Sequence, residues 1–163
     1  MSKNEKESMK ALKITNALWL GQIGNLIADF NKIIDIETIG YEQLFTYFAN
    51  TVQFGRDLVE FWVVFDDENK PVAFAHWMVK GLPHRGVVYC DFIYSASKDP
   101  AIADILMTEF EEFGKRSRCS YGEGDATNDV TFRLFSKIAE KRGYDVKRTK
   151  QINFLMRKKA VEQ

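Results

Sequence analysis

The order of elements in this protein is clearest around one stretch near its C-terminal end, VTFRLFSKIAEKRGY at residues 130–144. Apolar side chains recur there three and four positions apart, which is the spacing of one helix face: Val130, Leu134, Phe135 and Ile138. Gly143 follows, and glycine commonly ends a helix because it takes a left-handed backbone without strain. The stretch predicts a helix from Val130 to Lys141.

The segments on either side of this helix complete a regular order. Upstream, Pro100 opens a second helical pattern whose apolar residues line one face: Ile102, Ile105, Leu106, Phe110 and Phe113. A short apolar strand is expected between the two helices, around Arg118 to Tyr121. Downstream, Tyr144 to Met156 is long enough for two short strands or one bent one.

Three strands are expected before these helices. Leu58 to Phe65, Val72 to Val79 and Val87 to Tyr94 are rich in β-branched and aromatic residues, and polar turn residues join them. This pattern predicts an antiparallel meander. The runs FWVVF and VVYCDFIY are nearly continuous in apolar character, which indicates strands buried on both faces. We therefore expect helices to cover both sides of the sheet.

Two amphipathic helices are expected ahead of the meander. The first extends from Ala17 to Ile34 with Asn16 as its N-cap, because apolar residues recur there at helical spacing. The second, from Tyr41 to Phe54, lies between Gly40 and Gly55. The sequence therefore predicts that two helices precede the sheet.

Length and composition fit one domain. The chain has 163 residues, of which 45% are apolar and 13% aromatic, enough for a sizeable core. We expect a single domain over residues 11–158, a flexible polar tail at residues 1–10 and a short tail at residues 159–163. No apolar run approaches the roughly 20 residues that a membrane-spanning helix needs.

Charge, cysteine and histidine content argue against several classes of partner. Lys+Arg 23 and Asp+Glu 23 cancel, so we predict no nucleic acid and no membrane partner. Cys90 and Cys119 lie in apolar runs without a signal peptide ahead of them, which is typical of buried free thiols in the reducing cytoplasm. His76 and His84 are the two histidines, and they have no metal-ligand spacing with the cysteines, so we predict no metal.

The whole order of elements resembles the GNAT superfamily of acyl-CoA N-acyltransferases. The segments that carry the resemblance are Ile93 to Phe113 and Asp125 to Met156, where IAEKRGY at residues 138–144 takes the place of the family's aromatic pair, charged turn and Gly-Phe. The resemblance implies an α/β fold with a central mixed, mostly antiparallel sheet flanked by helices on both faces. Another mixed α/β fold is the alternative, since many contain helices that end at Gly-aromatic.

The resemblance implies a cofactor phosphate site at the loop and helix start after the fourth strand. Family members use a Gln/Arg-x-x-Gly-x-Gly/Ala pattern there, in which bare N–H groups and close approach at glycine bind pyrophosphate. In the matching positions Lys98 keeps a positive charge, Ala101 adds a methyl group and Ala103 is allowed, so these three are the expected contacts if acyl-CoA binds. Pro100 lacks an N–H, and Asp99 adds a carboxylate that repels phosphate. A Pro-initiated, Asp-capped helix explains the same residues without any ligand.

A second family feature is missing. The resemblance implies a tyrosine four residues before the helix-ending glycine, which protonates the departing thiolate of coenzyme A. That position is Ala139, and Tyr144 is expected to be a core aromatic residue. A general acid contributes about 10²–10⁴-fold, so its absence slows an enzyme without excluding one.

One carboxylate on the meander, that of Asp91, is a candidate catalytic group. Asp91 interrupts the apolar strand, and in the family a carboxylate on this strand often serves as base for the amine. If the turn between Val79 and Val87 pairs its strands symmetrically, His76 lies opposite Asp91 on the same face. Asp91 and His76 are therefore the candidate catalytic residues. The alternative is that Asp91 faces solvent or caps a backbone group, while His76 is a satisfied sheet histidine.

Two functions are compatible with these residues. One is an active acetyl-CoA-dependent N-acetyltransferase that acts on a small-molecule or protein amine. The other, which the altered loop and the missing tyrosine favour, is a non-catalytic binding or structural protein with a degenerate site and a protein partner. The short C-terminal helix followed by a strand such as INFLMRK, residues 152–158, resembles small degenerate GNAT-like proteins of tailed bacteriophages. That likeness suggests phage structural proteins as partners and a virion location in place of the cytoplasm.

Overall fold

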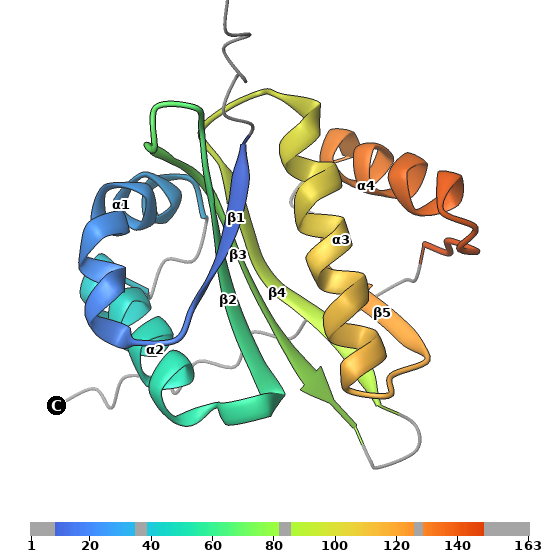
Figure 1. The fold of residues 1–163 in the computed structure, drawn as a ribbon, viewed down its shortest axis with the longest axis horizontal. Coiled ribbons are helices and arrows are strands. Elements are labelled where there is room, and N and C mark those ends of the chain that lie inside the picture. Colours follow the sequence, from blue (N-terminus) through green and yellow to red (C-terminus); the bar gives the residue numbers. More distant parts are fainter. Residues whose placement is uncertain (1–8, 35–38, 82–85, 126–128, 149–163) are drawn as a thin grey trace, which may run out of the picture.

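A five-stranded sheet forms the centre of the protein (Figure 1). The computed structural model describes residues 9–34, 39–81, 86–125 and 129–148. The strands follow one another across the sheet in chain order: β1 (Lys10–Ile14), β2 (Val59–Phe65), β3 (Pro71–Lys80), β4 (Val87–Ser95) and β5 (Tyr121–Gly124). Neighbours from β1 to β4 are antiparallel, and β5 runs parallel to β4. The sheet is mixed and mostly antiparallel, as predicted.

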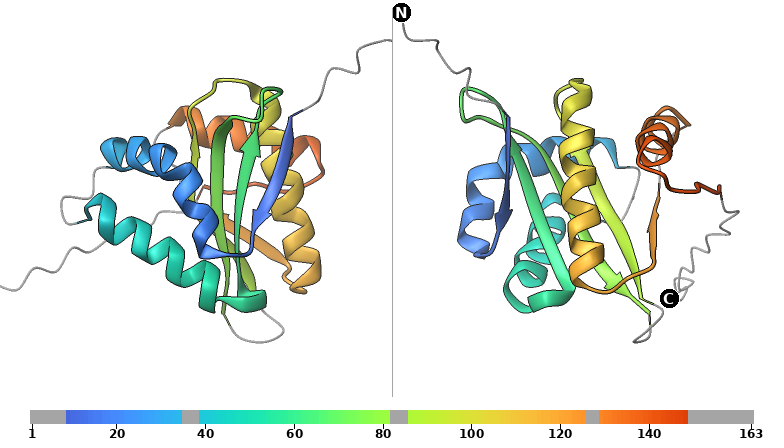
Figure 2. Two further views of the ribbon diagram at one scale, coloured as in Figure 1. Left: turned by 60° about the vertical axis from the view of Figure 1, so that its left-hand side comes forward. Right: turned by 45° about the vertical axis from the view of Figure 1, so that its right-hand side comes forward.

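Helices cover both faces of this sheet. They are α1 (Gly24–Ile33), α2 (Tyr41–Phe54), α3 (Pro100–Arg116) and α4 (Asp129–Lys141), with the short 3-10 helices η1 (Ala17–Ile23) and η2 (Arg56–Leu58). Figure 2 shows α1 and α2 on one face and α3 on the other, with α4 beside α3. The predicted α/β arrangement is confirmed. In the described segments no helix is both long and apolar enough to cross a bilayer.

The predicted meander is confirmed in β2, β3 and β4. Asp66 builds the turn between β2 and β3, because its Oδ1 accepts hydrogen bonds from the backbone N–H groups of Glu68 at 3.0 Å and Lys70 at 2.9 Å. Asn69 in this turn takes a left-handed backbone with φ 59°, which asparagine tolerates better than most residues. The polar run between the strands therefore forms a tight turn for local reasons.

The start of the chain differs from the prediction. A strand, β1, precedes the two helices, and its first residue, Lys10, lies within the predicted tail. β1 is an edge strand that pairs with β2, from Lys10 opposite Phe65 to Ile14 opposite Phe61. Leu12 on this strand is half exposed. A short edge strand with one solvated side carries little hydrophobic pattern, which is why the sequence did not indicate it.

The helix predicted from Ala17 to Ile34 divides into η1 and α1. Gly21 and Gly24 lie in this segment, and glycine lowers helix propensity, which favours a short 3-10 turn over one continuous α-helix. The start of the segment follows the prediction. Oδ1 of Asn16 accepts a hydrogen bond from the N–H of Leu18 at 2.9 Å, so Asn16 is the N-cap.

β2 and β3 are buried on both faces, as their apolar runs predict, whereas Val88 is the one fully buried residue of β4 and the others are partly exposed. Beneath α1 and α2 the core is aromatic, and the ring centroid of Phe48 lies 5.0 Å from that of Phe61 and 5.7 Å from that of Phe74. On the opposite face Trp77 packs with the buried stripe of α3: Ile102, Leu106 and Phe113. These two cores fix the positions of α2 and α3 relative to the sheet.

β4 and β5 pair over part of their length. The parallel ladder extends from Val87 opposite Tyr121 to Cys90 opposite Gly124, and β4 continues past it to Ser95. The second half of β4 therefore has β3 as its partner on one side, while its other side is not paired with β5.

The strand predicted around Arg118 to Tyr121 begins later, at Tyr121. Arg118 has a left-handed backbone with φ 55°, and its N–H donates to the carbonyl oxygen of Lys115 at 3.1 Å. Arg118 therefore still belongs to the turn after α3.

The predicted end of the last helix is confirmed. Gly143 has φ 87°, and the N–H of Tyr144 donates to the carbonyl oxygen of Ala139 at 3.1 Å, which closes α4. Tyr144 itself is 49% exposed, so the prediction that it is a core aromatic residue is wrong. The strands predicted from Tyr144 to Met156 lie mostly outside the described residues, and residues 144–148 form no strand.

Candidate functional site

Asp91 lies at a β-bulge in β4. His76 of β3 pairs with Phe92 and Trp77 pairs with Cys90, so Asp91 is the extra residue between the two pairs. The register differs by one residue from the predicted one, in which His76 lies opposite Asp91. The two side chains still meet, because a bulge re-aims the extra side chain of its strand.

Four side chains meet at this bulge and form what we term the Asp91 cluster: Tyr47 and Thr51 from α2, His76 from β3 and Asp91 from β4. The hydroxyl of Tyr47 donates to Oδ2 of Asp91 at 2.6 Å. Nδ1 of His76 lies 3.3 Å from the same oxygen, close enough for an ion pair but poorly aligned for a hydrogen bond. Nε2 of His76 lies 3.0 Å from Oγ1 of Thr51. The cluster joins α2 to two strands.

The members of the cluster differ in their access to solvent. His76 is fully buried, with the rings of Phe48 and Phe61 at centroid distances of 5.4 Å and 6.0 Å. The side chain of Asp91 is 19% exposed, and Tyr47 is half-buried. Asp91 and Tyr47 are therefore accessible to a ligand, whereas His76 is not.

Electrostatic interactions in the cluster keep the Asp91 carboxyl ionised and the Tyr47 phenol protonated. Burial alone would raise the pKa of this carboxyl, but its contacts with His76 and Tyr47 and the charge of Lys80 outweigh burial and lower the pKa. The carboxylate is ionised at neutral pH and is a weak proton acceptor. Burial, together with the hydrogen bond to Asp91, raises the pKa of Tyr47 and keeps its phenol protonated.

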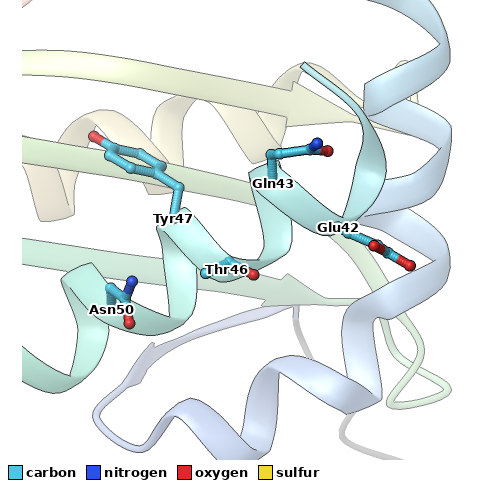
Figure 3. A pocket seen from close by; sticks show the side chains of 5 residues that line it. All are labelled: Glu42, Gln43, Thr46, Tyr47 and Asn50. Atoms are coloured by element: carbon cyan, nitrogen blue, oxygen red, sulfur yellow. The ribbon is translucent and has the colours of Figure 1, made fainter. Parts of the chain in front are cut away.

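An open depression of about 470 Å³ lies on the outer side of α2 (Figure 3). Its lining comes from one face of that helix and is mostly polar: Glu42, Gln43, Thr46, Tyr47 and Asn50. Tyr47 belongs both to this lining and to the Asp91 cluster. A molecule bound in the depression would therefore contact the residue that donates to Asp91.

Sequence reasoning missed Tyr47 and Thr51. The two residues are four positions apart on α2, so they project from the same side of the helix. They flank the apolar stripe that contains Leu44 and Phe48, which is the position of residues at the border between a helix and its sheet. That spacing is a weak signal, because tyrosine and threonine are common at such borders.

The loop before α3 uses its backbone donors within the chain. The N–H of Ala96 donates to the carbonyl oxygen of Val72 at 2.9 Å. The N–H of Ser97 donates to Oγ of Ser95, and the N–H of Asp99 donates to Oγ of Ser97, both at 3.2 Å. These serine hydroxyls bond the amides that an anion at this loop would otherwise contact.

The first turn of α3 is capped in the same way. Oδ1 of Asp99 accepts from the N–H of Ala101 at 2.9 Å, and the carbonyl oxygen of Asp99 accepts from the N–H of Ile102 at 3.2 Å. Pro100 is the first residue of the helix and has no N–H. The structural alternative for this stretch, a Pro-initiated and Asp-capped helix, is what forms.

The three expected cofactor contacts lie in different environments. Lys98 and Ala101 are exposed, whereas Ala103 is buried against the sheet at 6% exposure. Ala139, the position of the missing phenol, lies on α4. The chain thus brings Asp91 and His76 together as predicted, although through a bulge, and at the start of α3 it bonds the N–H groups of Ala101 and Ile102 to Asp99.

Other reactive groups add little to the site. Burial, with the charges of Asp91 and Asp125, raises the pKa of the Cys90 thiol to about 12, and burial also raises the pKa of Cys119. Both are free, half-buried thiols and poor nucleophiles. Within the described part of the chain, no group of three or more His, Cys, Asp or Glu side chains is arranged to hold a metal ion.

No protein-family model and no curated protein sequence matches this chain. Solved structures match it over nearly its whole length. A probable acetyltransferase has a TM-score of 0.70 at 12% identity, covering 92% of this chain and 99% of that chain. The aminoglycoside N-acetyltransferase AAC(6')-Iy, solved in complex with CoA, has a TM-score of 0.69 at 14% identity, covering 96% of this chain and 99% of that chain.

A predicted acetyltransferase from Clostridium acetobutylicum, solved with acetyl-CoA, has a TM-score of 0.64 at 17% identity. The match covers 89% of this chain and 96% of that chain. The TM-scores establish a shared architecture, whereas sequence identities of 12–17% leave the reaction open. The chain has the GNAT-like α/β fold of these acetyltransferases.

Proposed function

We propose that this protein has the acetyltransferase fold without the acetyl transfer reaction, and that it acts by binding a partner. The start of α3 carries the proposal, because the N–H groups of Ser97, Asp99, Ala101 and Ile102 are bonded to Asp99 and to two serine hydroxyls. A helix start binds an anion through free N–H groups. Acyl-CoA would have to replace these bonds.

Charge at the same place also opposes the phosphates. The carboxylate of Asp99 lies at the positive end of the helix dipole, where it is stabilised and where a diphosphate would meet it as a like charge. Pro100 adds no donor and Ala101 carries a methyl group, so close approach of a ligand is hindered. Lys98 is the one expected contact of favourable charge. As they are arranged, the residues at this helix start do not fit a pantetheine carrier with a diphosphate.

The opposite side of the site supports the same proposal. The lowered pKa of Asp91 makes it a weak base for an ammonium group. His76 is buried and cannot touch a substrate. Ala139 supplies no phenol for a departing thiolate. An active enzyme would therefore work without a strong base at Asp91 and without an acid at Ala139.

A binding role uses the groups that are present. The depression on α2 presents polar side chains next to the ionised Asp91, and hydrogen-bonding groups of this kind suit a protein surface. A protein partner is our proposal for the occupant. Phage structural proteins and a virion location are carried by the sequence resemblance of residues 152–158 alone.

Calorimetric titration with acetyl-CoA tests the proposal. We expect no saturable binding, which corresponds to a dissociation constant weaker than about 1 mM. A constant in the low micromolar range would overturn the proposal. In that case Lys98→Ala, compared with Lys137→Ala on the exposed side of α4, would tell whether the ligand uses the loop before α3.

An active N-acetyltransferase is the second candidate function, and the Asp91 cluster favours it. Asp91 is partly exposed at a bulge, and Tyr47 links it to a depression large enough for a small amine. In this case Asp91 would accept the proton of the bound ammonium, directly or through water, and Tyr47 would orient the carboxylate.

Thiol release from acetyl-CoA in the presence of a panel of amines distinguishes the two functions. If the second holds, Asp91→Asn lowers the rate by about 10²-fold or more while the fold is kept. Asp67→Asn, in the turn between β2 and β3, is the matched control and should leave the rate unchanged. If the first holds, wild type and both variants release no thiol above background.

A further inference from the structure

Both ring nitrogens of the buried His76 face polar groups. Nε2 lies 3.0 Å from Oγ1 of Thr51, and Nδ1 lies 3.3 Å from Oδ2 of Asp91. The ring itself is fully buried between α2 and the sheet. A buried histidine normally keeps one charge state, because a second proton needs a hydrogen-bond acceptor that the interior seldom offers.

Thr51 can supply that acceptor without any movement of the backbone. Its hydroxyl lies 3.0 Å from the carbonyl oxygen of Phe48, one turn earlier in α2. When the hydroxyl proton points to this carbonyl, Oγ1 is free to accept a proton from Nε2 of His76. When the hydroxyl rotates about its C–O bond, the same group donates to a bare Nε2. Thr51 therefore satisfies Nε2 with or without a proton.

The other nitrogen has no such choice. Oδ2 of Asp91 already accepts from the hydroxyl of Tyr47, and the carboxylate is ionised, so it presents electron pairs to Nδ1. A bare Nδ1 at 3.3 Å from it would place two electron pairs against each other, whereas an N–H is attracted even at a poor angle. Nδ1 of His76 therefore carries a proton in both states.

We propose that His76 is a reversible proton switch: it takes up and releases one proton at Nε2 while it stays buried, and the hydroxyl of Thr51 reverses its direction each time. The proton is exchanged with solvent water, and no other bond changes. With the proton, His76 and Asp91 form a neutral pair. Without it, the pair carries one negative charge.

The change in charge of the His76–Asp91 pair should alter the electrostatic potential at the α2 depression. From α2, Tyr47 faces the ring; from β4, Asp91 faces it; and from β2, the unionisable Phe61 does. Lys80 of β3 acts on Asp91 through its charge. Tyr47 separates the pair from the depression, so a cation there should be held better when Nε2 has lost its proton.

Nitrogen NMR of the histidine ring in the full chain tests the switch. The chain has two histidines, so His84→Gln leaves His76 as the source of the signal. As the pH is raised, we expect His76 to pass from a ring protonated at both nitrogens to a neutral ring with its proton on Nδ1, with the fold unchanged. A neutral ring with its proton on Nε2, or a ring that keeps one charge state at every pH at which the chain is folded, would overturn the switch.

Two variants of Thr51 test the role of its hydroxyl. In Thr51→Val the second proton has no acceptor, so we expect it to be lost at a lower pH than in wild type. Thr51→Ser keeps the hydroxyl and should titrate like wild type. Equal titration of the valine variant and wild type would overturn the proposal. If the valine variant does not fold, the wild-type ring still provides the test, because a neutral ring with its proton on Nε2 would overturn the proposal.

Discussion

The Asp91 cluster and the start of α3 are the two places where the sequence predicts chemistry. They differ in whether their polar groups are accessible to a ligand or are hydrogen-bonded within the chain. At the cluster, a bulge turns Asp91 out of its strand toward Tyr47, and part of the carboxylate still reaches solvent. At α3, the N–H groups of Ser97, Asp99 and Ala101 are bonded to Asp99 and to serines of the same loop. One region keeps polar groups available to a ligand, and the other has used them internally.

This difference separates the fold from its reaction. The sheet and its two cores hold α2 and α3 in place whether or not a ligand binds. A helix start is equally stable when a side chain caps it as when an anion does, so Asp99 and Pro100 cost the fold nothing. The architecture therefore tolerates the loss of an anion site, and likeness to acetyltransferases alone does not establish a reaction.

The largest expected effect is at the support of the cluster. Phe48 is fully buried and contacts the rings of Phe61, Phe74 and His76, so it attaches α2 to the sheet. Phe48→Ala should lower the free energy of unfolding by about 3–5 kcal/mol, measured by urea denaturation, because it leaves a cavity in a packed core. The Asp91 cluster should loosen while the start of α3 is unaffected.

Phe54→Ala is the matched control for this prediction. Phe54 is the last residue of the same helix and is 70% exposed, so its loss should change the free energy of unfolding by less than about 1 kcal/mol. Equal losses in the two variants would mean that α2 is not held by the aromatic core.

A smaller effect is expected at Glu60, a buried carboxylate on the α3 face. Oε1 accepts from Nζ of Lys13 at 2.6 Å and from Arg116 at 2.9 Å, and Oε2 accepts from Nε1 of Trp62 at 2.8 Å. Burial alone would raise the pKa of Glu60, but these hydrogen bonds outweigh burial and lower it. Glu60→Gln should cost about 1–2 kcal/mol at pH 7, since Lys13 and Arg116 can turn to solvent.

The pH dependence of this effect has a definite sign. Because the folded pKa of Glu60 lies below its unfolded value of 4.5, the stability it contributes is complete above that pH. It is lost as the pH falls through the folded pKa, where wild type and Glu60→Gln should converge. Urea denaturation from pH 7 to pH 3 measures this, and a gap between the two proteins that widens toward acid would contradict it.

The parts of the fold that follow local rules could be predicted from the sequence. Asn16 caps its helix, Pro100 begins α3 and Gly143 ends α4, and each depends on the chemistry of one residue and its near neighbours. The meander follows from its apolar runs. Strands that are apolar at nearly every position need to be covered on both faces, so helices are expected on both sides of the sheet.

The parts that depend on distant packing could not be predicted. The bulge at Asp91 is set by how β4 fits β3 and α2 together, and no local pattern marks an extra residue in a strand. Tyr47 and Thr51 became part of the site through this same fit. β1 was missed because its partner β2 lies about a third of the chain away and its own pattern is weak.

The smallest expected change in stability is at Asp99, and it bears most directly on the comparison between the two regions. Asp99→Ala removes a helix cap and should lower the free energy of unfolding by about 1 kcal/mol. The same change frees the N–H of Ala101 and removes a negative charge from the helix start. A protein with Asp99→Ala, Pro100→Ala and Ala101→Gly should therefore bind acetyl-CoA measurably more tightly than wild type in calorimetry.

Asp104→Asn, one turn further along α3, is the control for charge, because its amide oxygen can still accept from Arg142 as Oδ1 of Asp104 does at 2.6 Å. If the triple variant gains affinity and Asp104→Asn does not, the bonded donors at the helix start are what excludes the cofactor. If both gain equally, the general negative charge of this face excludes it, and capping by Asp99 is incidental. If the triple variant folds and gains nothing, the helix start is not the barrier, and the contrast between the two regions would have to be explained by the position of α4 or by residues beyond α3.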